Sequence, residues 1–299
     1  MAAQPTLPVT EPIPDNGENI PEPRAARPRM STRNRLLFFL TAWLLVLMPF
    51  LFWWGTWFGR ALTDKKMREY LNDNAHPRHI QHAVVQLGQR MSQRDASAAR
   101  WYGDLVRVAS DPREEVRSTD AWVMGQDTAG PGFHEALLKM LGDSAMIVRG
   151  NAALSLVRFG DSSGRAEIVS LLQPVVITSP YAGRVTDTAG IGTAIHQGGL
   201  IAKLQSADGQ VHELRSPITG RVRTVSTVTG GSVSSGASVA TVDPGEEQAW
   251  EALRALYLIG QVDDLPAIRP YERELPEIPE RLRQQALDTE RAIQERARK

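Results

Sequence analysis

The feature that most constrains this chain is an uncharged apolar run over residues 36–58, LLFFLTAWLLVLMPFLFWWGTWF. At about 1.5 Å rise per residue, a helix of this length can cross a hydrocarbon core about 30 Å thick. Trp53, Trp54 and Trp57 gather towards its end, where amphipathic rings favour the membrane–water interface. The run therefore predicts a single transmembrane helix. We prefer this to a cleaved signal peptide, because no small-residue cleavage site follows the run.

The charges that flank the run indicate an orientation. Five arginines precede it and four basic residues follow it, which leans towards an N-terminus in the cytoplasm. We therefore expect a single-pass protein of the inner (cytoplasmic) membrane, with its C-terminal body on the periplasmic or extracytoplasmic side. The flanking residues are Arg24, Arg27, Arg29, Arg33 and Arg35, then Arg60, Lys65, Lys66 and Arg68.

Composition excludes several classes of function. Lys+Arg and Asp+Glu number 34 each, so the chain lacks the basic excess that nucleic-acid binding requires. There is no cysteine, which rules out disulfides, thiolate metal sites and cysteine nucleophiles. Residues 1–35 are rich in proline and poor in large apolar side chains, so we expect a disordered tail there.

Residues 66–173 have helical periodicity and an internal repeat. The stretch DPREEVRSTDAWVMGQ from Asp111 aligns with DSAMIVRGNAALSLVRFG from Asp143, 32 positions later. Asp at the start of each stretch can cap a helix, and the Val and Ala positions recur at helical spacing. Because Arg117 and Arg149 can reach the Asp of a following repeat, we expect these four charged residues to join successive units.

The two stretches resemble short bacterial HEAT repeats, with D-x-x-x-x-V-R-x-x-x-A in each unit. Thr119-Asp120 departs from the small residues usual at that place in the pattern. The resemblance implies that residues 66–173 form stacked helical hairpins. Such an α-solenoid offers a broad surface to partners.

At residues 174–244 the composition becomes rich in Val, Ile, Thr, Gly and Ser, with no helical period, which is typical of β-sheet. SPYAGRV from Ser179 recurs as SPITGRV from Ser216, 37 positions later. Similar tails follow from Gly192 and Gly231. Two copies of one strand–turn–strand unit predict a pseudo-twofold β-sandwich, in which neither half covers its own apolar face.

This second repeat resembles the biotinyl/lipoyl-like fold, a barrel-sandwich hybrid found in carrier domains and in periplasmic adaptor (membrane-fusion) proteins. A carrier of that kind holds biotin or lipoate on a lysine at a hairpin tip. Here the tip carries Asp208-Gly209, a strong hairpin signal, while Lys203 lies earlier in the strand. We therefore expect no cofactor, and we consider Asp208 and Gly209 a candidate docking point. A short turn also replaces the long helical hairpin that adaptors insert between the two halves.

Residues 246–299 return to helical spacing, and we interpret them as further HEAT-like helices. The β-domain would then be an insertion between helices of one solenoid. A separate helical cap on the β-domain is the alternative. The predicted fold class is thus an α+β multidomain protein with a transmembrane helix, a HEAT-like α-solenoid and a lipoyl-like all-β domain.

The histidines invite a metal hypothesis. His76, His79 and His82 are spaced by three, but zinc sites add further ligands at defined spacing and only Asp73 lies near. We expect a solvated helix face and no metal. Paired acidic residues such as Glu114-Glu115 fit helix first turns, so we predict no catalytic residue.

The sequence as a whole predicts a non-catalytic, membrane-anchored adaptor or scaffold. Its partners would be other envelope proteins, such as a transporter, and no nucleic acid. Two alternatives remain open: a cytoplasmic-facing HEAT scaffold that docks a soluble enzyme, and a diverged biotin or lipoate carrier subunit.

Overall fold

The computed structural model describes residues 31–55 and 61–298, and these divide into two compact units, residues 1–60 and 61–299. Each unit is described here by itself. The first holds one helix, α1 (Thr32–Gly55). Its apolar side chains are largely exposed within that unit, such as Leu45 at 70% and Val46 at 72%. The predicted disordered tail, residues 1–35, falls mostly outside the described residues.

The predicted transmembrane span at residues 36–58 is corrected by the structure. Among residues 31–55 and 61–298, no helix has both the length and the apolar character needed to cross a bilayer. The predictions of an inner-membrane location, a membrane partner and an extracytoplasmic body were built on this span and are withdrawn with it.

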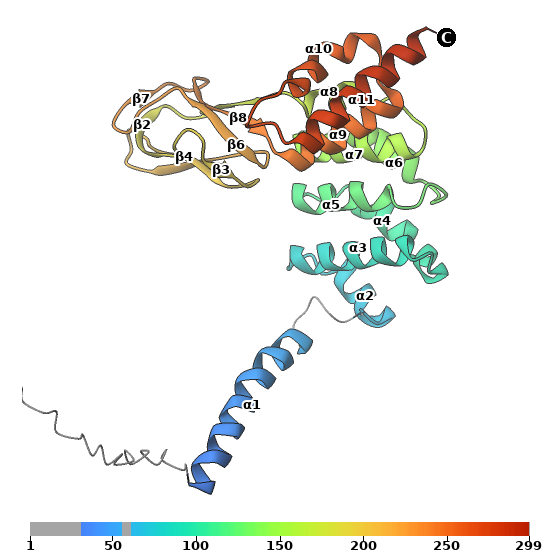
Figure 1. The fold of residues 1–299 in the computed structure, drawn as a ribbon, viewed down its shortest axis with the longest axis vertical. Coiled ribbons are helices and arrows are strands. Elements are labelled where there is room, and N and C mark those ends of the chain that lie inside the picture. The colour runs from blue at the N-terminus through green and yellow to red at the C-terminus, as the bar shows by residue number, and fades with distance from the viewer. Residues whose placement is uncertain (1–30, 56–60, 299) are drawn as a thin grey trace, which may run out of the picture. The chain divides into compact units, whose positions relative to one another are not determined.

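The fold class is corrected accordingly. The described chain is a mixed helix-and-sheet domain with two antiparallel sheets and no transmembrane helix among the described residues. Figure 1 shows its helices and strands. The helices before the strands are α2 (Asp64–Leu71), α3 (Pro77–Ser92), η1 (Ala96–Trp101), α4 (Tyr102–Val108), α5 (Glu114–Met124), α6 (Phe133–Met140), α7 (Met146–Arg158) and α8 (Arg165–Ser170). Those after the strands are α9 (Glu246–Ile259), η2 (Val262–Asp264), α10 (Leu265–Ile268), η3 (Arg269–Glu272) and α11 (Glu280–Ala297).

Helices α3, α5 and α7 pack one on the next in a stack (Figure 1). Each buries side chains at helical spacing; α3 buries Ile80, Val84, Leu87 and Met91. These side chains join those of α2, η1, α4 and α6 in one apolar core. The repeat over Asp111 and Asp143 thus falls on α5, α7 and the turns before them.

The strands form two four-stranded antiparallel sheets with orders β1-β8-β6-β3 and β5-β4-β2-β7. Strands β1 to β4 of the first half of the repeat are equivalent to β5 to β8 of the second half. Replacing each strand by its equivalent turns the first strand order into the second. The two sheets enclose one apolar core. Equivalent turns in the two halves start with Ser179 and Ser216, which are both buried. Each serine donates its hydroxyl to the carbonyl two residues further along the chain. The strands are β1 (Val175–Thr178), β2 (Gly183–Thr188), β3 (Ala194–Ile195), β4 (Leu200–Gln205), β5 (Val211–Arg215), β6 (Gly220–Val225), β7 (Ser232–Val233) and β8 (Ser238–Pro244).

The chain returns from the strands to the helices that it left. Helix α9 packs against α7 and α8, and α11 packs against α9, around a second helical core. Three polar contacts join the segments on either side of the strands: Arg165 to Asp264, Tyr271 to the carbonyl of Leu172, and Gln248 to the carbonyl of Leu171. The helices after the strands therefore continue the packing of those before them and frame the groove described next.

Candidate functional site

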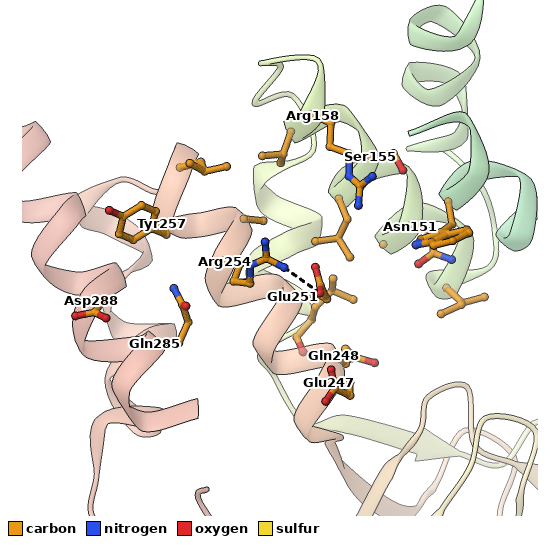
Figure 2. A pocket seen from close by; sticks show the side chains of 18 of the residues that line it. Asn151, Ser155, Arg158, Glu247, Gln248, Glu251, Arg254, Tyr257, Gln285 and Asp288 are labelled. Carbon is orange, nitrogen blue, oxygen red and sulfur yellow. Dashed lines mark hydrogen bonds and ion pairs between the residues drawn. The ribbon is translucent and has the colours of Figure 1, made fainter. Parts of the chain in front are cut away.

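The described chain has a groove of about 1030 Å³ that is open to solvent. Its walls come mainly from α7, α9 and α11, which are far apart in the sequence. Figure 2 shows Asn151, Ser155 and Arg158 on one wall and Glu251 and Arg254 on the facing helix. The return of the chain after the strands is what brings these walls together.

Large apolar side chains lie open in this groove. Trp122 of α5 is 48% exposed, and Tyr257 and Leu258 of α9 are 43% and 61% exposed. Leu154 and Ile147 of α7 are partly buried beside them. Exposed aromatic and leucine side chains gathered in one concave place are typical of binding surfaces rather than of ordinary protein surface.

Charged groups of both signs surround these apolar side chains. Arg254 pairs with Glu251 at 3.4 Å between Nη1 and Oε1, and Arg291 pairs with Asp288 at 3.3 Å. Three arginines and four acidic residues line the groove, so its charge is nearly balanced. The set is Arg158, Arg254, Arg291, Glu247, Glu251, Asp288 and Glu295.

Hydrogen bonds within the fold hold several polar groups of the groove in place. The Ser155 hydroxyl donates to the carbonyl of Ala121 at 2.8 Å, and the Asn151 amide donates to Ser118 at 3.0 Å. Arg158 donates to the carbonyl of Gly125 and to the side chain of Gln126. A serine hydroxyl that is fixed to a backbone carbonyl lacks the adjacent general base that activates a nucleophile. The fold thus holds these polar groups in fixed positions along the groove.

Two of the four predicted inter-repeat residues meet directly. Arg117 of α5 reaches Asp143 before α7 through two bonds, at 2.6 and 2.8 Å. Asp111 instead binds Arg113 of its own segment. Arg149 pairs with Glu167 of α8 at 3.0 Å, because the chain turns into β1 where a further repeat would supply an Asp.

The predicted docking point at Asp208 and Gly209 lies at the tip of the β4–β5 hairpin and does not line the groove. Gly209 has φ of +85°, a conformation that glycine adopts without strain, and its N–H donates to the carbonyl of Ser206. The Ser206 hydroxyl binds Asp208, and this bond holds the pKa of the Asp208 carboxyl below its usual range. The tip is therefore ordered by its own turn contacts.

A serine and a histidine also meet at this tip. The Ser206 hydroxyl lies 3.2 Å from Nε2 of His212, whose ring stacks on Tyr181 with centroids 4.0 Å apart. A catalytic triad requires the carboxylate to hold the imidazole, whereas Asp208 holds the serine hydroxyl. This arrangement does not have triad geometry.

A second cluster, which we call the Asp–His cluster, consists of Asp73, His76 and His79. One potential ligand atom from each lies within 4.8 Å of the others. His82, also weighed from the sequence, points its Nε2 towards Gln86 instead. The sequence spacing drew attention to the histidines, but it did not show that Asp73 stands between two of them.

Sequence reasoning did not find the groove residues. Trp122, Tyr257 and Leu258 read as positions on separate amphipathic helices, and only the packing of α9 against α7 brings them together. The feature of the sequence that could have indicated them is a large apolar residue on a helix face that is otherwise polar.

Comparison with known proteins identifies no family. No protein-family model matches the chain, and no curated protein matches it. Similar solved structures include a single-chain, multi-domain long-chain acyl-CoA carboxylase, at 19% identity, 35% coverage of this chain and a TM-score of 0.23. The urea carboxylase of Kluyveromyces lactis matches at 14% identity, 42% coverage and a TM-score of 0.22. The chain spans 10% of each carboxylase.

A third similar structure is a designed armadillo repeat protein. It matches at 15% identity, over 76% of this chain and 80% of that one, with a TM-score of 0.38. Likenesses of this extent carry no argument about function, so the proposal below rests on the groove itself.

Proposed function

We propose that the chain is a non-catalytic scaffold that binds a polypeptide segment of a partner protein in the groove between α7, α9 and α11. The observation that carries the proposal is the meeting of exposed Trp122, Tyr257 and Leu258 with balanced charges in one open groove. Aromatic side chains supply much of the binding energy at protein–protein contacts.

The chemistry of the groove favours a polypeptide over other ligands. A nucleic acid needs an excess of Lys and Arg along its path, whereas this lining has acidic residues at least as numerous as its arginines. The amide side chains of Asn151, Gln248 and Gln285 also line the groove. An amide both donates and accepts hydrogen bonds, as a peptide backbone does.

The open form of the groove also fits a chain segment better than a small molecule, which a pocket normally encloses. Pockets for small molecules enclose about 300–1,000 Å³ and cover most of the ligand. This groove has about 1030 Å³ and is open along its length. An extended or helical segment can lie in such a groove with its apolar side chains on Trp122 and Leu258.

The proposal is tested by panning a phage-displayed peptide library on the immobilised full-length chain and titrating selected peptides calorimetrically. Leu258→Arg places a charge on the exposed apolar wall, so we expect it to weaken binding at least about tenfold. Val228→Arg is the matched control, because Val228 is 72% exposed on the β-domain, outside the groove. Equal affinity of the two variants, or a library that yields no binder, would contradict the proposal.

A further inference from the structure

We propose that Asp73, His76 and His79 bind one divalent transition-metal ion of the zinc type. The site is independent of the groove, and it spans the turn after α2 and the first turn of α3. Two imidazole nitrogens converge there on one carboxylate oxygen. Nδ1 of His76 lies 2.9 Å and Nδ1 of His79 lies 2.5 Å from Oδ2 of Asp73.

The donor set suits such an ion. Imidazole and carboxylate are ordinary ligands of Zn²⁺, with bonds of about 2.0–2.2 Å. In a tetrahedral site, bonds of that length place the ligand atoms about 3.4 Å apart. Each imidazole nitrogen would have to move away from Oδ2 of Asp73 by less than about 1 Å to admit the ion. A zinc ion would take the place of the protons that now join Asp73 to the two rings.

The backbone prepares the carboxylate for this role. Oδ1 of Asp73 accepts the backbone N–H groups of Ala75 and His76, both at 3.2 Å. Those bonds fix the carboxylate and turn Oδ2 towards the imidazoles. Pro77 then begins α3 with its φ already restricted, so the turn between the ligands has few alternative conformations.

The two histidines are held in complementary ways. The ring of His79 stacks on Tyr70 with centroids 4.3 Å apart and planes 8° apart, which sets its orientation. Its side chain is only 22% exposed, as is fitting for an anchored ligand. The side chain of His76 is 65% exposed and borders a hollow of about 360 Å³ lined with Arg78, Gln81 and Glu115. An ion can therefore enter from solvent on the His76 side.

Three protein ligands leave one tetrahedral position for water or for a ligand from another molecule. The bound ion would tie the end of α2 to the start of α3. It would therefore stabilise the folded chain by an amount that grows with the ratio of the free ion concentration to its dissociation constant. Protons compete with the ion for the same ligand atoms, so acid should weaken binding.

The test measures zinc binding to the untagged full-length chain by equilibrium dialysis at pH 7.5. We expect one ion per chain and a loss of affinity of about tenfold or more in His76→Ala and in Asp73→Asn. His76 is exposed, so its removal should leave the fold intact, and Asn at 73 can still accept the backbone bonds of the turn. His134→Ala is the matched control, because His134 pairs with Asp161 at 2.7 Å and the described residues supply no third ligand beside them.

A second readout separates zinc from simple ion pairing. In NMR spectra of the imidazole groups, zinc should shift the resonances of two of the six histidines and leave that of His134 unchanged. The proposal is overturned if the wild-type chain retains no zinc, or if His76→Ala and Asp73→Asn retain as much as His134→Ala. It is also overturned if zinc shifts the imidazole resonances of no histidine.

Discussion

Arg117 donates a hydrogen bond to each carboxylate oxygen of Asp143, at 2.6 Å from Nε to Oδ2 and 2.8 Å from Nη2 to Oδ1. The side chains are 14% and 11% exposed, so the pair is largely withdrawn from water. It joins α5 to the turn before α7, and Nη1 of Arg117 also bonds the carbonyl of Asp111 at 2.8 Å. A bidentate pair of this kind fixes the distance and the rotation between consecutive helices of the stack.

Removing one partner should therefore destabilise the fold. Arg117→Met leaves Asp143 poorly solvated and without its cation, and we expect a loss of about 2–3 kcal/mol in the free energy of unfolding, measured in urea at pH 7. Arg223→Gln is the control, because its pair with Asp243 is 55% and 33% exposed and should be worth less than about 1 kcal/mol. Similar losses in the two variants would show that the Arg117–Asp143 pair has no special weight.

Asp120 is a buried carboxylate for which neither oxygen has a hydrogen-bond partner among the described residues. Burial raises its pKa well above the usual value. The aligned position 32 residues later is Ala152, which is buried without any polar group. Because Ala also favours helix, Asp120→Ala should raise the free energy of unfolding by about 1–3 kcal/mol at pH 7.

The sign of the pH dependence follows from that raised pKa. Folded Asp120 keeps its proton at pH values where the unfolded chain has lost it, so its contribution to stability falls as the pH rises above about 3.8. Asp120→Ala should therefore reduce the decline in the free energy of unfolding as the pH rises above about 3.8. A variant less stable than wild type at pH 7 would mean that the carboxylate makes a needed interaction.

The pair of Glu272 and Glu290 should affect how the stability of the fold depends on pH near neutrality. Loss of solvation, followed by the hydrogen bond and the negative charge of Glu290, raises the pKa of Glu272 to about 7. Its ordinary value is 4.5, so the stabilisation present below pH 4.5 is lost as the pH rises to about 7. Glu272→Gln should remove that part of the decline in the urea midpoint between pH 5 and 7.5. The prediction fails if both proteins show the same decline.

Gly220 marks a place where β6 passes very close to β8. A Cβ atom at Gly220 would lie 1.8 Å from the carbonyl oxygen of Asp243, and the equivalent Gly183 has a carbonyl oxygen at 2.7 Å. The strands would have to separate, so we expect Gly220→Ala to cost about 2–4 kcal/mol in thermal or urea unfolding. Gly190→Ala, with no atom closer than 3.6 Å to its Cβ, should change stability by less than about 0.5 kcal/mol.

Both internal repeats of the chain could be recognised from the sequence alone. An offset of 32 residues relates the segments of α5 and α7, and an offset of 37 relates β2 to β6. A repeat defines a local unit, and the burial pattern of each unit follows from its own periodicity. The partner of Arg149 could not be found in this way, because the repeat stops where β1 begins and Glu167 belongs to no aligned position.

Two further features lay beyond the reach of the sequence. The groove depends on α9 returning to α7 after the strands, a long-range packing that no local pattern specifies. The membrane-span prediction was wrong for a different reason. It rested on the apolar composition of residues 36–58 alone, whereas no helix among the described residues is long and apolar enough to cross a bilayer.

The most direct test of the account is where a selected peptide touches the chain. A photo-cross-linking residue is placed either at Leu258 in the groove or at Ala207 in the exposed β4–β5 tip, and the cross-linked peptide is identified by mass spectrometry. Binding in the groove predicts cross-links from position 258 that unlabelled peptide suppresses, and none from position 207. Cross-links that form at position 207, and not at 258, would contradict it and move the binding surface to the β-domain.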